Sequence, residues 1–311
     1  MNATRLIALA AIPLTAIQFY QRPGMASSAT KNDKEVDDAM SDVTTESNGG
    51  KEETCPEPNE KRLVLKCGAH MIPDSRKGDQ GEDAWFIQDS AVGVFDGVGG
   101  WRRKGVDPGK YSRALRDGSV QYIKEHGVGD LKLALKHAVE GNPNLGSSTA
   151  CLAAMPQSPS LQVLNLGDSG LIQFRKEQIK FSTPEQQFRF NFPYQLGTNS
   201  LCTVDDSDAY VLEMQTGDTV VLATDGALDN LGEGEMESLA RLTKDFSPNK
   251  AAEEFAKTAN RNSLDREYDS PFAQNARKVG KNYSGGKQDD ITVVLCRVCE
   301  QSKSWLPWSK L

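Results

Sequence analysis

Four aspartates stand at the ends of short apolar runs, where their side chains could do chemistry together. Asp96 ends Val-Gly-Val-Phe-Asp, Asp168 follows Val-Leu-Asn-Leu-Gly, Asp225 follows Val-Val-Leu-Ala-Thr, and Asp289 comes just before the run Ile-Thr-Val-Val-Leu. Apolar runs of this length are typical of buried strands, so the pattern predicts carboxylates at strand ends. Carboxylates without histidine or cysteine partners favour hard cations such as Mg²⁺ or Mn²⁺. The sequence therefore predicts a metal-dependent hydrolase.

The spacing of these acids suits the hydrolysis of a phosphate ester at two metal ions. That chemistry needs carboxylates that hold the ions a few ångströms apart, an acidified water and open positions for phosphate oxygens. Gly97 after Asp96 and Gly226 after Asp225 would let the backbone approach the ions, which a β-carbon would hinder. A single Asp-Gly is more often a plain turn. The prediction therefore depends on the recurrence of the acids.

The elements that must position these acids can be predicted from apolar periodicity. Strand-length runs bordered by Gly, Pro or Asp occur at 63–67, 84–87, 92–95, 149–155, 161–166, 171–174, 210–214, 219–223 and 291–298. Helical patterns occur at 108–122, where Asp107-Pro108 supplies a cap, and at 131–138, 235–242 and 251–259. The short turn at 175–178 predicts an antiparallel hairpin. This order predicts an α+β fold with a central pair of antiparallel sheets covered by helices.

Composition divides the 311 residues into parts. Residues 31–60 carry ten acidic and three basic side chains and almost no large apolar groups, so we predict an acidic disordered linker. Residues 61–300 form a single predicted catalytic domain, and residues 61–311 are nearly neutral, with thirty-three acidic and thirty-one basic side chains. A nucleic-acid partner therefore receives no electrostatic support, which also weakens the alternative of a metal phosphodiesterase acting on nucleic acid.

The six cysteines are scattered through apolar runs. This distribution suits buried free thiols in a reducing compartment better than a disulfide framework. The pair Cys296 and Cys299 has a zinc-like spacing but lacks further ligands at comparable spacing.

Both ends of the chain resemble targeting signals. Residues 1–30 contain two arginines, no acid and an apolar run at 6–17, which predicts a targeting segment or a marginal membrane anchor. Residues 301–311 form a tail that ends in Ser309-Lys310-Leu311, the peroxisomal tripeptide. The two signals would direct the protein to different organelles, the mitochondrion and the peroxisome, and the choice between them stays open.

Six motifs in a fixed order carry a family resemblance. They are Gly81-Glu-Asp-Ala84, Val94-Phe-Asp-Gly-Val-Gly-Gly-Trp101, Gly146-Ser-Ser-Thr-Ala150, Asn165-Leu-Gly-Asp-Ser-Gly170, Ala223-Thr-Asp-Gly226 and Lys287-Gln-Asp-Asp-Ile-Thr292. Over about residues 63–298 the chain resembles the PPM-type (type 2C) metal-dependent protein serine/threonine phosphatases. Within that family it looks most like the seventh yeast type 2C phosphatase and its mitochondrial relatives. The resemblance implies a four-layer sandwich of two antiparallel sheets flanked by helices.

The resemblance also implies roles for individual residues. Two ions, Mn²⁺ or Mg²⁺, would be held by Asp96 as the bridge, with Glu82, the Gly97 carbonyl, Asp225 and Asp289, and a weaker third ion by Asp168. Asp83 would orient the metal-bound water, and Asp96, Asp225 and Asp289 would act in catalysis through that water. Residues 182–210, here called the flap, are predicted to lie beside the substrate.

Two positions depart from the family pattern. Val98 stands where many members have a histidine thought to protonate the leaving group, and none of the three histidines of the chain takes its place. Gly78 stands where a phosphate-binding arginine is usual, with Arg76 and Lys77 nearby. Arg76 and Arg102 are the candidates for that role, because a guanidinium can clamp two phosphate oxygens.

The sequence thus predicts a protein serine/threonine phosphatase that acts on phosphorylated proteins by a dimetal-activated water. The alternative is a catalytically silent module that kept the fold to bind phosphoproteins. Retention of every metal carboxylate favours the enzyme, because an idle site need not keep like charges together. A cysteine-nucleophile mechanism lacks its phosphate-binding loop.

Overall fold

Two five-stranded antiparallel sheets form the centre of the domain in the computed structural model, which describes residues 62–301. The first sheet has the order β1 (Leu63–Ile72), β14 (Ile291–Glu300), β13 (Thr219–Ala223), β7 (Gly170–Arg175), β8 (Gln178–Ser182). The second has the order β12 (Asp208–Glu213), β6 (Ser160–Leu166), β5 (Ala150–Gln157), β3 (Ala91–Asp96), β2 (Asp83–Gln88). The predicted α+β class and the central pair of sheets are confirmed.

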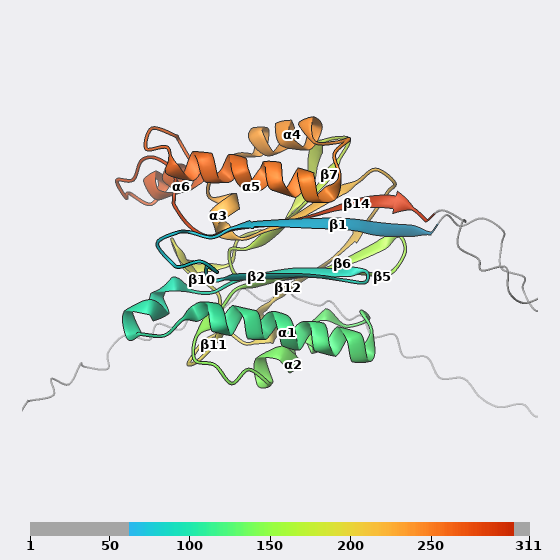
Figure 1. Ribbon diagram of the computed structural model, residues 1–311, viewed down its shortest axis with the longest axis horizontal. Coiled ribbons are helices and arrows are strands. Elements are labelled where there is room, and N and C mark those ends of the chain that lie inside the picture. Colours follow the sequence, from blue (N-terminus) through green and yellow to red (C-terminus); the bar gives the residue numbers. More distant parts are fainter. Residues whose placement is uncertain (1–61, 302–311) are drawn as a thin grey trace, which may run out of the picture. The chain divides into compact units, whose positions relative to one another are not determined.

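Helices cover the outer face of each sheet (Figure 1). Helices α1 (Pro108–His126) and α2 (Leu131–Glu140) pack on the second sheet, and α4 (Glu233–Leu242) and α5 (Pro248–Leu264) pack on the first. One apolar cluster lies under each helical layer, and a third fills the space between the sheets. The domain is therefore the four-layer sandwich expected from the resemblance.

Local signals explain where several elements begin and turn. Asp107 accepts a hydrogen bond from the Gly109 amide at 3.0 Å, and Pro108 is the first residue of α1, as predicted. Lys176 and Glu177 have φ angles of 52° and 58° between β7 and β8, which is the geometry of a two-residue hairpin turn. Ser270 caps α6 (Pro271–Lys278), a helix that the periodicity did not predict.

Short elements near the ends of the sheets were also not predicted. They are the 3₁₀ segments η1 (Gly99–Lys104) and η2 (Val204–Asp206), helix α3 (Asp225–Leu228), and strands β4 (Ser147–Ser148), β9 (Gln187–Arg189), β10 (Phe192–Pro193) and β11 (Leu196–Gly197). The flap contains β9, β10, β11 and η2, and β11 pairs with β4. The pairing of such short strands depends on residues far away in the sequence, so local patterns do not predict them.

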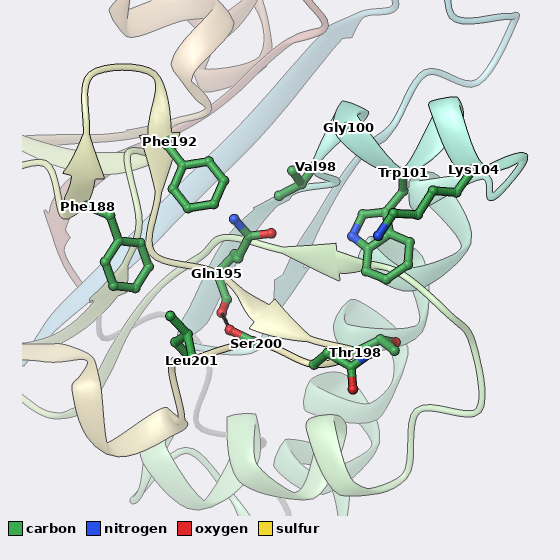
Figure 2. Close-up of a pocket in the computed structure, with 11 residues that line it drawn as sticks. Val98, Gly100, Trp101, Lys104, Phe188, Phe192, Gln195, Thr198, Ser200 and Leu201 are labelled. Atoms are coloured by element: carbon green, nitrogen blue, oxygen red, sulfur yellow. Dashed lines mark hydrogen bonds between the residues drawn. The ribbon is translucent and has the colours of Figure 1, made fainter. Parts of the chain in front are cut away.

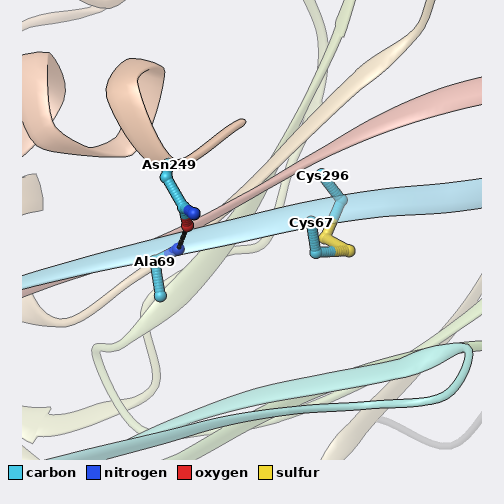
Figure 3. The surroundings of a disulfide bond; sticks show 4 residues. All are labelled: Cys67, Ala69, Asn249 and Cys296. Atoms are coloured by element: carbon cyan, nitrogen blue, oxygen red, sulfur yellow. Dashed lines mark hydrogen bonds between the residues drawn. A yellow bond between two sulfur atoms is a disulfide. The ribbon is translucent and has the colours of Figure 1, made fainter. Parts of the chain in front are cut away.

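A disulfide joins the first strand to the last, and this corrects the prediction of free thiols for two of the cysteines. Cys67 on β1 and Cys296 on β14 lie opposite each other in the register, with a Cα–Cα distance of 4.0 Å, and their sulfurs are bonded (Figure 3). Their separation of 229 residues hid the pairing from the sequence. Cys151, Cys202 and Cys299 are free thiols, and the first two are buried as predicted. The disulfide also removes Cys296 from any zinc site with Cys299.

The predictions for residues 1–30, the linker at 31–60 and the Ser-Lys-Leu tail fall outside the described residues and stay predictions. Within residues 62–301, no helix combines the length and the apolar character needed to cross a membrane.

Candidate metal centre

Three of the four strand-end aspartates converge on one point. Carboxylate oxygens of Asp96, Asp168 and Asp225 all lie within 4.8 Å of one another. Asp96 is the last residue of β3, Asp168 lies between β6 and β7, and Asp225 follows β13 as the first residue of α3. These strands belong to both sheets, so closure of the sandwich brings the acids together.

The ammonium group of Lys287 connects the fourth aspartate to this cluster. Its Nζ lies 2.5 Å from Asp225 Oδ2, 2.7 Å from Asp229 Oδ2 and 3.5 Å from Asp289 Oδ2. Burial disfavours the charge of Lys287, but the surrounding carboxylates outweigh burial and raise its pKa well above the ordinary value. Asp225 and Asp289 therefore lie on the same side of the site, within reach of one cation.

A second lysine, Lys77, links Asp289 to the remaining predicted ligand, Glu82. Its Nζ lies 2.9 Å from Glu82 Oε2 and 3.2 Å from Asp290 Oδ2, and it donates a hydrogen bond to Asp289 Oδ1. Burial opposes its charge, but the carboxylates of Asp289, Asp96 and Asp290 prevail and raise the pKa of Lys77. Two lysines thus bind three of the carboxylates that the sequence analysis assigned to metal ions, namely Glu82, Asp225 and Asp289.

Lys77, Lys287 and Asp229 belong to the site, but the sequence analysis assigned none of them a role there. Lys287 lies two residues before Asp289, and Asp229 lies one helical turn after Asp225, a spacing that places both carboxylates on one face. These spacings were visible signals. Lys77 lies in the loop before Glu82, where no periodicity indicates the direction of a side chain.

Burial and crowding set the protonation of the acids. Burial, and then the neighbouring carboxylate of Asp225, raise the pKa values of both Asp96 and Asp168 well above the ordinary range. Burial also opposes ionisation of Asp225, but the adjacent Lys287 prevails and lowers its pKa. The acid cluster therefore contains more carboxyl groups than the neighbouring lysines neutralise. This excess favours the binding of a further cation.

Asp83 occupies a fixed place behind the cluster. It is opposite Asp96 in the pairing of β2 with β3, and its Oδ2 accepts hydrogen bonds from the hydroxyls of Thr224 at 2.8 Å and Thr292 at 2.7 Å. Burial, followed by the nearby Asp290, raises the pKa of Asp83 to about 8. The two threonines hold one carboxylate oxygen, so the side chain has a single orientation.

The residues present fit divalent cations that prefer oxygen ligands. The Oδ1 atoms of Asp83, Asp168 and Asp225 are buried and accept no hydrogen bond from the described residues. A buried carboxylate oxygen without a partner is costly unless a cation or water satisfies it. The acid cluster offers carboxylate oxygens, to which the predicted ligand Gly97 would add a carbonyl oxygen, and both are ligand types of Mg²⁺ and Mn²⁺.

Asp290 has a different task from Asp289. One of its carboxylate oxygens accepts from the Asp74 amide at 2.7 Å, and the other from the Glu82 amide at 2.8 Å. Its carboxylate thus fastens the loop that carries Lys77 and Glu82. Among the described residues, the Asp289 carboxylate accepts from no backbone amide of a distant segment.

The glycines after Asp96 and Asp225 are required by neighbouring protein atoms. A β-carbon at Gly97 would lie 2.7 Å from the Glu82 carbonyl oxygen, and one at Gly226 would lie 2.0 Å from the Asp290 carbonyl oxygen. The expected reason was close approach of the backbone to metal ions. In the structure, the close approach of two chain segments already excludes any larger residue at either position.

The two arginines predicted to bind substrate phosphate lie near the acids but have protein partners. Arg76 has a side chain 58% exposed, and its guanidinium binds the carboxylate of Asp74 and the Gln288 carbonyl at 2.7 Å. Arg102 forms an ion pair with Glu82 and donates to the Lys77 carbonyl at 2.5 Å. Lys77 contacts two of the predicted metal ligands, Glu82 and Asp289, whereas Arg102 contacts Glu82 alone and Arg76 forms its ion pair with Asp74.

No histidine of the described residues belongs to the acid cluster. His126 stacks on Tyr122 with ring centroids 4.4 Å apart, and His137 contacts the same ring at 5.6 Å, so both pack in the helical layer. Val98, at the position of the family histidine, lines an apolar pocket beside the cluster together with Trp101 (Figure 2).

Comparison with known proteins identifies the family. Residues 124–299 match the family model of stage II sporulation protein E, SpoIIE. The chain is 37% identical to "Probable protein phosphatase 2C 80" of Arabidopsis thaliana over 262 residues, 81% of this chain and 63% of that protein. It is 37% identical to the "Protein phosphatase PTC7 homolog" of Xenopus laevis over 267 residues, 76% of this chain and 89% of that protein.

Solved structures support the same assignment. The structure of the photosystem II phosphatase PBCP is 33% identical, with a TM-score of 0.71 over 75% of this chain and 98% of that chain. The chain spans 63% and 52% of the first two plant relatives, the latter being "Probable protein phosphatase 2C 55" of Arabidopsis thaliana. With the sandwich, the ordered motifs and these relatives together, the chain belongs to the PP2C, or PPM-type, family of protein phosphatases.

Proposed function

We propose that this chain is a metal-dependent protein serine/threonine phosphatase that hydrolyses phosphoserine and phosphothreonine in protein substrates. The observation that carries the proposal is the convergence of Asp96, Asp168 and Asp225 within 4.8 Å, where a buried oxygen of Asp168 and one of Asp225 accept no hydrogen bond from the described residues. The relatives named as protein phosphatases support the substrate class.

Each predicted ligand would have a definite place in this function. Asp96, Glu82, the Gly97 carbonyl, Asp225 and Asp289 would hold two ions, Mn²⁺ or Mg²⁺, and Asp168 would help to hold a weaker third. A related fold, 18% identical, has been solved with two manganese ions. Bound in such a site, the ions make water a better nucleophile and neutralise phosphate oxygens.

The chain itself would position the phosphate and the acids. Lys77 has its ammonium among Glu82, Asp289 and Asp290, so a small movement would offer it to a phosphate oxygen. Arg76 and Arg102 remain candidates for the same role at the edge of the site. Thr224 and Thr292 hold Asp83, so that its second oxygen can orient a water.

Leaving-group protonation lacks a side-chain acid at position 98. Since Val98 cannot donate a proton, turnover of poor leaving groups should be slower than that of activated aryl phosphates, because general acid catalysis typically contributes about 10²–10⁴-fold. A comparison of kcat for an aryl phosphate and a phosphoserine peptide tests this point, and similar values would contradict it.

The decisive experiment is phosphate release from a phosphothreonine peptide by the full chain with Mn²⁺, with Mg²⁺ and with chelator. Activity should require metal and should be lost in Asp225→Asn. The matched control is Asp117→Asn, because the Asp117 side chain is 68% exposed and lies on α1, outside the acid cluster and the flap. Absence of metal-dependent release from folded wild-type protein would favour the silent phosphoprotein-binding module.

A further inference from the structure

An apolar pocket opens beside the acid cluster, between the η1 segment and the flap. Its volume is about 380 Å³, which lies in the range of small-ligand pockets. Val98 and Trp101 form one side, and Phe188, Phe192 and Leu201 of the flap form the other, as Figure 2 shows. The exposed fractions of the three flap residues are 45%, 41% and 86%. Clustered exposed apolar side chains of this kind mark a binding surface, whereas isolated ones do not.

Both walls of the pocket continue directly into the acid cluster. On one side, Val98 follows Gly97, and its amide donates to the Ser147 carbonyl at 2.9 Å. On the flap side, Gln187 precedes Phe188, and its Nε2 donates to Asp168 Oδ2 at 3.3 Å. A chain that placed a phosphorylated residue at the acid cluster would therefore place a neighbouring residue in the pocket.

The pocket has a fixed shape because hydrogen bonds join its walls. Trp101 Nε1 donates to Ser147 Oγ at 2.7 Å, and Ser147 Oγ donates to Gln195 Oε1 at 2.6 Å. Gln195 belongs to the flap and lies between the two walls in Figure 2. Ser147 thus connects the η1 segment to the flap through two hydrogen bonds. The apolar side chains of the two walls take no part in this connection and can contact a ligand.

The charges at the edge of the pocket indicate what binds there. Lys104 lies over the ring of Trp101 at 4.4 Å, and Arg189 lies over Phe192 at 4.9 Å. An apolar pocket with cations on both sides suits a large apolar side chain in an acidic segment and disfavours a basic one.

We propose that this pocket, formed by Val98, Trp101, Phe188, Phe192 and Leu201, selects phosphoprotein segments that carry a leucine- or phenylalanine-sized side chain near the phosphorylated residue. The proposal rests on the proposed function and adds a substrate class to it. Val98, which stands where many family members have a histidine, contributes apolar surface to this pocket.

The test uses a series of phosphothreonine peptides with the full chain and Mn²⁺. In a serine background, one leucine is moved through about five positions on each side of the phosphothreonine, which covers roughly 17 Å of extended chain. The expected result is that kcat/KM is about tenfold higher with leucine at one or two adjacent positions than with serine there. In Leu201→Ser this ratio should fall to near one.

A matched control comes from the other helical layer. Leu242 is 63% exposed and lies outside the pocket, so Leu242→Ser makes the same chemical change and should keep the leucine preference. Hydrolysis of the peptides without any leucine preference would overturn the proposal and leave the proposed function intact.

A binding measurement keeps the test independent of catalysis. Fluorescence polarisation of the labelled peptides with the metal chelated should show the same leucine preference and the same loss in Leu201→Ser. Absence of that preference overturns the proposal even in an inactive protein. Concentration-dependent dimerisation that Leu201→Ser abolishes, measured by sedimentation, would also overturn it, because the occupant would then be a second copy of the chain.

Discussion

The space between the two sheets and the acid cluster at its end are formed by the same strands but have opposite chemistry. Leu171 on β7, Leu222 on β13 and Val294 on β14 are fully buried and fill the space between the sheets. Asp168, Asp225 and Asp289 lie three to five residues from these positions on the same chain segments, at the acid cluster. The apolar region stabilises the fold by burial, whereas the acid cluster brings like charges together, which costs stability unless a cation compensates. Stability and function should therefore respond to different substitutions.

The sharpest way to separate the two regions is Asp96→Asn. Changes in groups that only support metal ligands cost about 10–100-fold in activity, so replacement of Asp96, which is proposed to hold the ions directly, should cost more than about 100-fold. The melting temperature in chelator should not fall, because burial and the neighbouring Asp225 already raise the pKa of Asp96 well above its ordinary value, so a neutral amide replaces a carboxyl whose charge is disfavoured. Activity and thermal unfolding are measured on the same preparation. A variant that loses activity only because it unfolds would contradict the separation.

The converse change is Leu222→Ala, in the space between the sheets. The free energy of unfolding should fall by about 3 kcal/mol, since large-to-small changes in cores typically cost 2–5 kcal/mol. Urea unfolding measures the loss, with Leu242→Ala as the exposed control. Turnover per folded molecule should stay near the wild-type value, and a large loss of kcat at a temperature where the variant is folded would mean that the two regions are coupled.

Substitution of Lys77 tests which cation of the site meets the substrate. Lys77→Gln should raise KM for a phosphopeptide about tenfold, equivalent to roughly 1.4 kcal/mol, with a smaller change in kcat. Arg76→Gln and Arg102→Gln provide the comparison, because both guanidinium groups already bind other protein groups. If either arginine variant raises KM more than Lys77→Gln does, the phosphate contact belongs to that arginine.

The smallest expected effect is a pH dependence of the metal-free domain. Burial raises the pKa of Asp83 to about 8 and that of Asp229 to about 7, from ordinary values near 3.8. A carboxyl with a raised pKa in the folded state contributes stability that is full below about pH 4 and is lost as the pH rises through 7 to 8. In chelator, the melting temperature should therefore fall between pH 5.5 and 8.

The matched variant for this pH dependence is Asp229→Asn. It should flatten the fall because an amide does not titrate in this range. A wild-type melting temperature that rises across the same pH interval in chelator would show that other groups control the stability of the metal-free domain.

Sequence patterns predicted the apolar region and the positions of the acids well, for a physical reason. Strand periodicity and caps are local, so the runs that lead to Asp96 and Asp225, and the start of α1 at Pro108, could be predicted from neighbouring residues. The motif order then indicated the family and the sandwich. The assigned roles of the individual ligands remain predictions.

The parts that could not be predicted depend on contacts between distant segments. The ammonium of Lys77 reaches Asp289 across 212 residues of sequence, and Cys67 pairs with Cys296 across 229. The flap strands are two or three residues long, and their pairing is decided by partners such as Ser148 rather than by their own composition. Side-chain direction in such loops is a property of the assembled fold.

The pairing of β1 with β14 brings the start of the first strand beside the end of the last strand. Leu63 lies opposite Glu300, and the amide of Gln301 donates to the Arg62 carbonyl at 2.8 Å. A few added residues could join these positions, and new ends could be opened at the turn at Lys176 and Glu177 without changing any neighbouring pair of strands. In such a circular permutant, β1 and β14 become a local hairpin. Because the cost of closing a loop grows with its length, the permutant is expected to form the β1–β14 pair earlier, and the β7–β8 pair later, than the natural chain does.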